Sequence, residues 1–146
     1  MGAANEGRYL LVVDDNEEVR DLLALVLEEE GYSVRAVASG DEALRLVRQQ
    51  PPELITLDLS LPGKDGWAVL RELQSDPSTV RIPVLIISAF TRHLEETLRG
   101  QVARVIPKPF YLNQIIAEVK ATLDRDQDSS KGTASLGGSG APEGRA

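Results

Sequence analysis

Side chains suited to phosphoryl chemistry follow the short apolar runs of this 146-residue sequence, at the points where strands would end. They are Asp14 and Asp15 after the first run, Asp58 after the third, Ser88 at the end of the fourth and Lys108 after the fifth. Three carboxylates that lie close together raise one another's pKa unless a cation neutralises them, and Mg2+ prefers oxygen ligands. A carboxylate can also attack phosphorus and form an acyl phosphate, whose charge an ammonium and a hydroxyl group would stabilise. The set therefore indicates phosphoryl transfer at a magnesium site, provided that the fold brings these residues together.

Each of these residues also has an ordinary structural explanation. A pair of aspartates after a strand more often forms a turn or caps a helix, and a single acid such as Asp58 can lie in any loop. The chemical interpretation is favoured because carboxylate, hydroxyl and ammonium groups follow several strand ends of the same chain.

Five short apolar runs alternate with segments of helical periodicity. The runs lie at residues 9–13, 33–37, 54–57, 84–87 and 102–106. The third and fourth are almost entirely apolar, which is typical of strands buried on both faces of a parallel sheet. The alternation predicts a doubly wound α/β fold with a five-stranded parallel sheet and helices on both faces. If the strand order is 2-1-3-4-5, the first and third strands are neighbours, and Asp14, Asp15 and Asp58 meet in one crevice.

Helix boundaries are also marked in the sequence. Asn16 can cap the first helix, and Ser39 with Glu42 has the spacing of a capping box at the start of the second. The fourth helical segment, around residues 92–99, is short and has few apolar anchors, whereas the fifth has a clear apolar stripe.

Composition excludes several classes of protein. There are 16 basic and 23 acidic residues, for a formal net charge of -7, which argues against a partner that is a nucleic acid or an anionic membrane. The chain has no cysteine and one histidine, His93, so disulfides, cysteine nucleophiles and sites with several His or Cys ligands are excluded. Neither a signal peptide nor an apolar run of membrane-spanning length is present, and we expect a cytoplasmic domain.

The two ends differ from the rest of the chain. Residues 125–146 are dominated by Gly, Ser and Ala, with Leu136 as the one sizeable apolar side chain. Such a segment buries too little apolar surface to offset the entropy of ordering, which predicts a flexible tail or linker. We expect one domain over residues 8–124 and an N-terminal extension, disordered over residues 1–7.

Four segments together resemble the receiver domain of bacterial two-component response regulators. They are VVDDN at 12–16, LDLSLPGKDG at 57–66, IISA at 86–89 and KPF at 108–110. The resemblance covers about residues 8–124 and implies the CheY-like, flavodoxin-like strand order 2-1-3-4-5. Each motif alone is weak, but the set in this order is specific.

The resemblance implies a phosphoacceptor and a magnesium site. Asp58 would take a phosphoryl group from the phosphohistidine of a histidine kinase or a phosphotransfer protein. Asp15, Asp58 and the backbone carbonyl of Ser60 would bind Mg2+ directly, and Asp14 would act mainly through metal-bound water. The chain would be a signalling protein rather than an enzyme, apart from its own phosphorylation and dephosphorylation.

Two further residues would contact the phosphoryl group. Lys108 would pair with the phosphoryl oxygens, across a Lys108-Pro109 peptide expected to be cis, and Ser88 would donate a hydrogen bond once the group has arrived. The signal would then pass to a protein partner, without direct contact with nucleic acid or membrane, and a weak homodimer is compatible with this function.

The sequence departs from the family at its usual output face. Val105 stands where many receiver domains have an aromatic switch residue, three positions before the lysine. The segment from Ser88 to Lys108 is also about two residues shorter than the family pattern. These differences predict a short or irregular fourth helix and an atypical output face.

Two alternatives to this function remain. A Mg2+-dependent phosphohydrolase could use Asp58 as nucleophile, but Ser60 stands where such enzymes usually have a second acid. A binding module that kept the fold without phosphorylation would be favoured by loss of Asp14, Asp58 or Lys108, and all three are present.

The lifetime of a phosphorylated form can be predicted from two positions. Ser60 and Phe90 occupy the sites that tune autodephosphorylation in the family, and neither orients an attacking water as an amide or an acid does. We therefore expect slow to moderate loss of phosphate, measured by following the phosphorylated mass with time in the presence of Mg2+. A lifetime of seconds would contradict this expectation.

Overall fold

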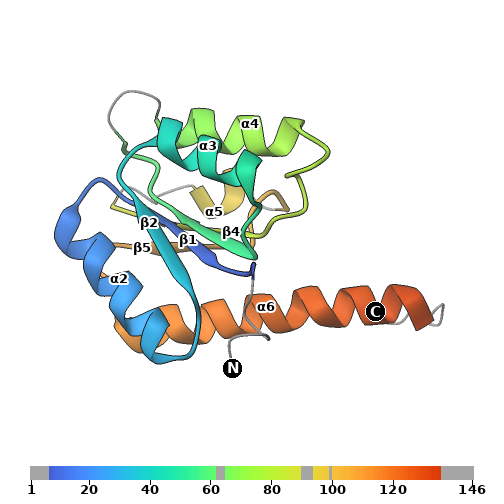
Figure 1. Ribbon diagram of the computed structural model, residues 1–146. Helices are drawn as coiled ribbons and strands as arrows, with labels where there is room; N and C mark the ends of the chain where they lie inside the picture. The colour runs from blue at the N-terminus through green and yellow to red at the C-terminus, as the bar shows by residue number, and fades with distance from the viewer. Residues whose placement is uncertain (1–6, 62–64, 90–93, 99, 136–146) are drawn as a thin grey trace.

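The computed structural model describes residues 7–61, 65–89, 94–98 and 100–135 (Figure 1). Its strands are β1 (Leu10–Val13), β2 (Val34–Val37), β3 (Leu54–Leu57), β4 (Val84–Ser88) and β5 (Arg104–Pro107). Its helices are α2 (Glu17–Glu29), α3 (Gly40–Gln49), α4 (Gly66–Ser75), α5 (Leu94–Thr97) and α6 (Leu112–Ser135). Strands and helices alternate along the chain, as the hydrophobic pattern predicts.

The strands form one parallel sheet in the order β2-β1-β3-β4-β5. Val13, the last residue of β1, pairs with Val37 of β2 on one side and with Leu57 of β3 on the other. The residues that follow β1 and β3 therefore emerge side by side at one edge of the sheet. Both the α/β fold class and the strand order 2-1-3-4-5 are confirmed.

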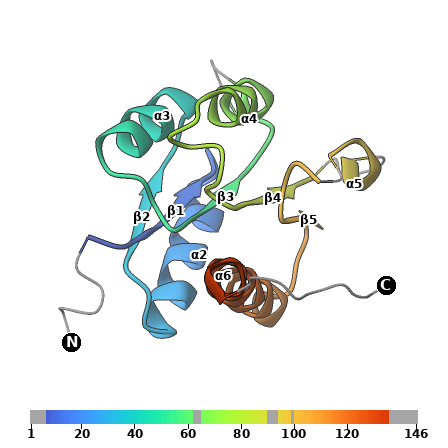
Figure 2. The same ribbon diagram turned by 90° about the vertical axis from the view of Figure 1, so that its right-hand side faces the viewer.

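Helices cover both faces of the sheet, and each covered face has its own apolar core (Figure 2). Alternate residues of β1 point to opposite faces, so Leu11 and Val13 pack on the side of α3 and α4, and Leu10 and Val12 on the side of α2 and α6. All four residues of β1 and of β3 are buried, which explains why these runs show no polar alternation. The two cores fix the sheet and therefore the edge at which the polar residues gather.

Side chains cap the starts of three helices. Asn16 accepts from the backbone N–H of Val19 at 3.1 Å, and Ser39 accepts from Glu42 at 3.3 Å. Asp65 accepts from Ala68 at 2.8 Å at the start of α4. These bonds satisfy N–H groups that have no partner inside the helix. They fix where α2, α3 and α4 begin after the preceding strands.

Helix α6 continues into the segment that was predicted to be a flexible tail from residue 125. It is helical up to Ser135. Once a helix is nucleated, each further residue adds a backbone hydrogen bond, and no proline interrupts the sequence before Pro142. Residues 136–146 and residues 1–6 lie outside the described residues, so the domain limits stay a prediction.

The fourth helix is represented by α5, a single turn beside β5 (Figure 2). Its expected limits at residues 92 and 99 lie outside the described residues, as does His93. Over the part of the chain that the structure describes, no helix is both long enough and apolar enough to cross a membrane.

Two leucines of α2 provide a test of this packing. Leu27 is fully buried against the sheet, whereas Leu25 is 53% exposed. We expect Leu27→Ala to lower the free energy of unfolding by about 2–5 kcal/mol, because it leaves a cavity in the core. The matched control Leu25→Ala should change it by less than about 0.5 kcal/mol. Urea unfolding measures both, and equal effects would contradict the burial described here.

Candidate functional site

Three carboxylates meet at the carboxyl edge of the sheet. Asp14 follows β1 and Asp58 follows β3, and an oxygen of each lies within 4.8 Å of an oxygen of Asp15 and of the other. Asp14 and Asp58 are buried, at 2% and 5% exposure, whereas Asp15 is exposed. The N–H of Asp58 donates to the carbonyl of Val13 at 3.0 Å, so the end of β3 is held against β1. The predicted convergence of the three acids is found.

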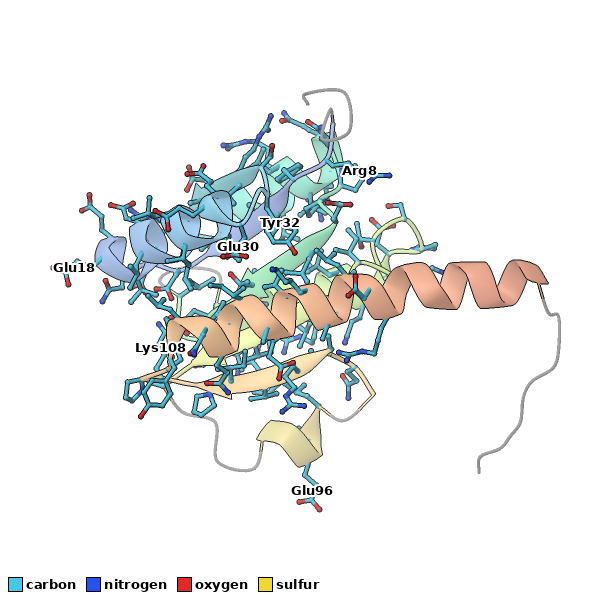
Figure 3. The ribbon with its side chains drawn as sticks, turned by 90° about the horizontal axis from the view of Figure 1, so that it is seen from below. Arg8, Glu18, Glu30, Tyr32, Glu96 and Lys108 are labelled. Atoms are coloured by element: carbon cyan, nitrogen blue, oxygen red, sulfur yellow. The ribbon has the colours of Figure 1, made fainter. Side chains whose placement is uncertain are left out.

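Lys108 lies between the two buried carboxylates. Its Nζ is 2.8 Å from Oδ2 of Asp14 and 3.0 Å from Oδ2 of Asp58, and its side chain is 19% exposed. Figure 3 shows Lys108 beside the start of α6, at the same end of the molecule as Glu18 in the first turn of α2. The Lys108-Pro109 peptide is cis, as expected. The lysine thus supplies a positive charge where two negative charges would otherwise repel each other.

Two opposing effects act on the pKa of Lys108. Burial is the largest single effect and lowers the pKa, because it disfavours the charged ammonium. Hydrogen bonds to Asp14 and Asp58, together with their charges, raise it, and their sum outweighs burial. The net result is a pKa above the usual 10.5, so the ammonium is charged at neutral pH.

The second oxygen of Asp58 is also held. Its Oδ1 accepts from the hydroxyl of Ser88 at 3.2 Å and from the backbone N–H of Ser60 at 3.0 Å. Ser88 is buried at the end of β4, and its carbonyl accepts from the N–H of Lys108 at 2.9 Å. Donors from three different segments of the chain therefore fix the carboxylate plane of Asp58.

Asp14 has a partner at each of its polar groups. Its Oδ1 accepts from the N–H of Asn16 at 2.9 Å, and its own N–H donates to Val37 at 3.2 Å. Its carbonyl accepts from Nη1 of Arg20, in the first turns of α2, at 3.0 Å. The sequence did not predict a role for Arg20. Its only distinguishing feature there is its position, one turn into the helix that follows the acid pair.

Gly66 is a close neighbour of Asp58. A Cβ at residue 66 would collide with the carbonyl oxygen of Asp58 and with Cα of Leu59. The N–H of Gly66 donates to the carbonyl of Leu59 at 3.1 Å. The glycine therefore lets the start of α4 pack directly on the backbone that carries Asp58.

The donor set fits a hard divalent cation. Asp14, Asp15 and Asp58 offer carboxylate oxygens within one small volume, and Mg2+ is bound in proteins by one or two carboxylates together with water and phosphate. Ser60, whose carbonyl is the fourth predicted ligand, is tied to Asp58 through its own N–H. The residues present are therefore compatible with a magnesium site.

Two other positions were expected to affect signalling, and the structure describes one of them. Val105 is 6% exposed and belongs to the apolar core on the side of α3 and α4, which also includes Leu98. Phe90 lies outside the described residues, so its predicted effect on phosphate lifetime stays a prediction.

Comparison with known proteins agrees with this geometry. Over residues 10–120 the chain matches the family described as the response regulator receiver domain. The chain belongs to this family. The earlier resemblance is thereby confirmed, together with the flavodoxin-like order of the sheet.

Solved receiver-containing structures superimpose on this receiver domain. A sensor protein from Polaromonas sp. JS666 is 30% identical, with a TM-score of 0.74, and the match covers 82% of this chain and 97% of that one. The signal receiver domain of a signal transduction histidine kinase from Syntrophus aciditrophicus is 30% identical, with a TM-score of 0.73 and coverage of 80% and 89%. NtrX from Brucella abortus is 30% identical, with a TM-score of 0.77, and the match covers 85% of this chain and 29% of NtrX. The match therefore covers nearly all of the first two chains but less than a third of NtrX.

The raised pKa of Lys108 predicts a pH-dependent stability difference. Lys108→Met leaves Asp14 and Asp58 facing each other, and we expect it to lower the free energy of unfolding by about 1–3 kcal/mol at pH 8. A pKa that is higher in the folded state stabilises the fold below the unfolded value of 10.5 and loses this contribution as the pH rises through the folded value. The difference between wild type and variant should therefore shrink above pH 10.5.

The matched control is Lys120→Met, since Lys120 forms an exposed ion pair with Glu30. Its effect on urea unfolding should be much smaller. A Lys108→Met variant as stable as the wild type at pH 8 would show that the lysine does not offset the repulsion between the two acids.

Proposed function

We propose that this receiver domain accepts a phosphoryl group on Asp58 from the phosphohistidine of a histidine kinase or a phosphotransfer protein. The observation that carries the proposal is the set of donors on its carboxylate. Lys108 holds one oxygen of Asp58, and Ser60 and Ser88 hold the other. Family membership supports the same conclusion, because receiver domains are signalling domains of two-component systems.

The reaction exchanges one bond for another at phosphorus. An oxygen of Asp58 forms the new O–P bond while the P–N bond to the donor imidazole breaks, and its electron pair returns to the imidazole nitrogen. Lys108 already lies 3.0 Å from this carboxylate and would meet the negative charge of the transferred group. Asp58 and Lys108 need little rearrangement before the reaction, and this lowers its free-energy barrier.

Asp14, Asp15, Asp58 and the backbone carbonyl of Ser60 would hold Mg2+. When bound, this ion neutralises charge on the transferring phosphoryl group. The burial of Asp14 and the exposure of Asp15 suit different tasks, since a buried acid keeps a fixed orientation and an exposed one leaves the site open to the donor protein.

Ser88 would report the arrival of the phosphoryl group. Its hydroxyl donates to Asp58 in the unphosphorylated structure and would donate to a phosphoryl oxygen after transfer. Val105 is β-branched and buried, so an aromatic side chain swinging inward does not accompany this change. The signal would pass through the loops after β4 and β5 to a protein partner.

Partners and location are part of the same proposal. We infer a cytoplasmic protein whose output is a changed contact with another protein domain, without binding of nucleic acid or membrane by this domain. NtrX, in which the matching domain is less than a third of the chain, illustrates a receiver that belongs to a longer protein. A weak homodimer is compatible with this output.

The proposal is tested by phosphorylation with a small donor. The protein incubated with acetyl phosphate or phosphoramidate and Mg2+ should gain the mass of one phosphoryl group, because Asp58 is the prepared nucleophile. Asp58→Asn and Asp58→Ala should show no gain, whereas Asp21→Asn, at an exposed acid of α2, should behave as wild type. Intact-protein mass spectrometry measures this, and chelation of Mg2+ should abolish the gain.

Two results would favour the alternatives. Absence of any mass gain in the wild type would favour a binding module that is not phosphorylated. Repeated turnover of phosphate monoesters, dependent on Asp58, would favour a phosphohydrolase.

A further inference from the structure

One residue outside the acid cluster contacts the peptide that joins its first two members. Nη1 of Arg20 lies 3.0 Å from the carbonyl oxygen of Asp14. Arg20 is half-buried, and its own N–H donates to the carbonyl of Asn16 at 2.9 Å, within the first turn of α2. The guanidinium therefore connects a rigid helix to the loop that carries the acids.

The carboxylate of Asp15 depends on its backbone for orientation. Among the residues that the structure describes, none donates a hydrogen bond to that carboxylate, whereas Asp14 and Asp58 each accept from several donors. The exposed Asp15 side chain is thus the least constrained of the three acids.

Two peptide units border Asp15, and each is held by one side chain. The carbonyl of Asp14 and the N of Asp15 belong to one planar unit, so the bond from Arg20 also fixes the N and Cα of Asp15. The following unit is held by the N–H of Asn16, which donates to Oδ1 of Asp14. That second bond lies within the loop itself, and Arg20 anchors the loop to α2.

We propose that Arg20 is a positioning residue of the metal site, which orients Asp15 by holding the Asp14–Asp15 peptide. Without this bond the Asp15 carboxylate has more orientations to lose when a cation binds, and affinity for Mg2+ falls. The inference rests on the proposed magnesium site and adds to it a residue that contacts neither the metal nor the phosphoryl group.

The direction of the change in Mg2+ affinity distinguishes a positioning role of Arg20 from a purely electrostatic one. A guanidinium close to a cation site repels the cation, so its removal strengthens Mg2+ binding if charge is its only effect. Loss of an outer residue that orients a metal ligand weakens binding instead, typically by about tenfold or more. The two explanations therefore predict opposite changes in the dissociation constant.

The experiment is titration of the protein with MgCl2 by isothermal titration calorimetry. Arg20→Met keeps the aliphatic stem and removes the donor and the charge, and we expect its dissociation constant for Mg2+ to rise about tenfold. Arg20→Gln, whose amide ends well short of the Asp14 carbonyl, should show the same direction of change. Arg45→Met, at an exposed arginine of α3, is the matched control for loss of one positive charge and should bind as wild type.

Thermal unfolding of each metal-free variant shows that it is folded, and either folded variant of Arg20 suffices for the test. An unchanged or stronger affinity for Mg2+ in that variant would overturn the positioning role while leaving the magnesium site intact. Failure of the wild type to bind Mg2+ would overturn the magnesium site itself.

Discussion

The site depends on one ammonium group placed between two buried carboxylates. Parallel pairing of β1 with β3 forces Asp14 and Asp58 into neighbouring positions, and their like charges would oppose that arrangement. The opposing cation comes from Lys108, which follows β5, two strands away from β3 in the sheet. The repulsion is therefore offset only when the sheet is assembled from β1 to β5, and this couples the formation of the site to the completion of the fold.

Much of this arrangement could be predicted from the sequence, because parallel strands all end at the same edge of the sheet. Buried parallel strands appear as apolar runs, and whatever follows them must emerge at the same edge. Asp14, Asp58 and Ser88 were found in this way, and the motif around Lys108 followed from its place after the fifth run. The strand order itself came from the family resemblance, since alternation alone does not fix which strands are neighbours.

Other features depend on tertiary contacts that no local pattern records. An arginine on an amphipathic helix normally contacts solvent, so nothing in the sequence distinguished Arg20 from any other helical arginine. The continuation of α6 to Ser135 is not visible in the composition of the C-terminal segment, because helix extension depends on the residues that are already helical. Val105 was recognised as unusual, but only the structure shows that it is buried against the same core as Leu98.

Gly66 allows the start of α4 to lie directly against the backbone that follows β3. The backbone at the start of α4 packs directly on the backbone of Asp58 and Leu59, with no room for even a methyl group. Because the interior is close-packed, this contact can hardly be compressed. A bulkier group attached to Asp58 can be accommodated only by displacement elsewhere around the pocket. The backbone at the start of α4 thus serves as a fixed support for Asp58.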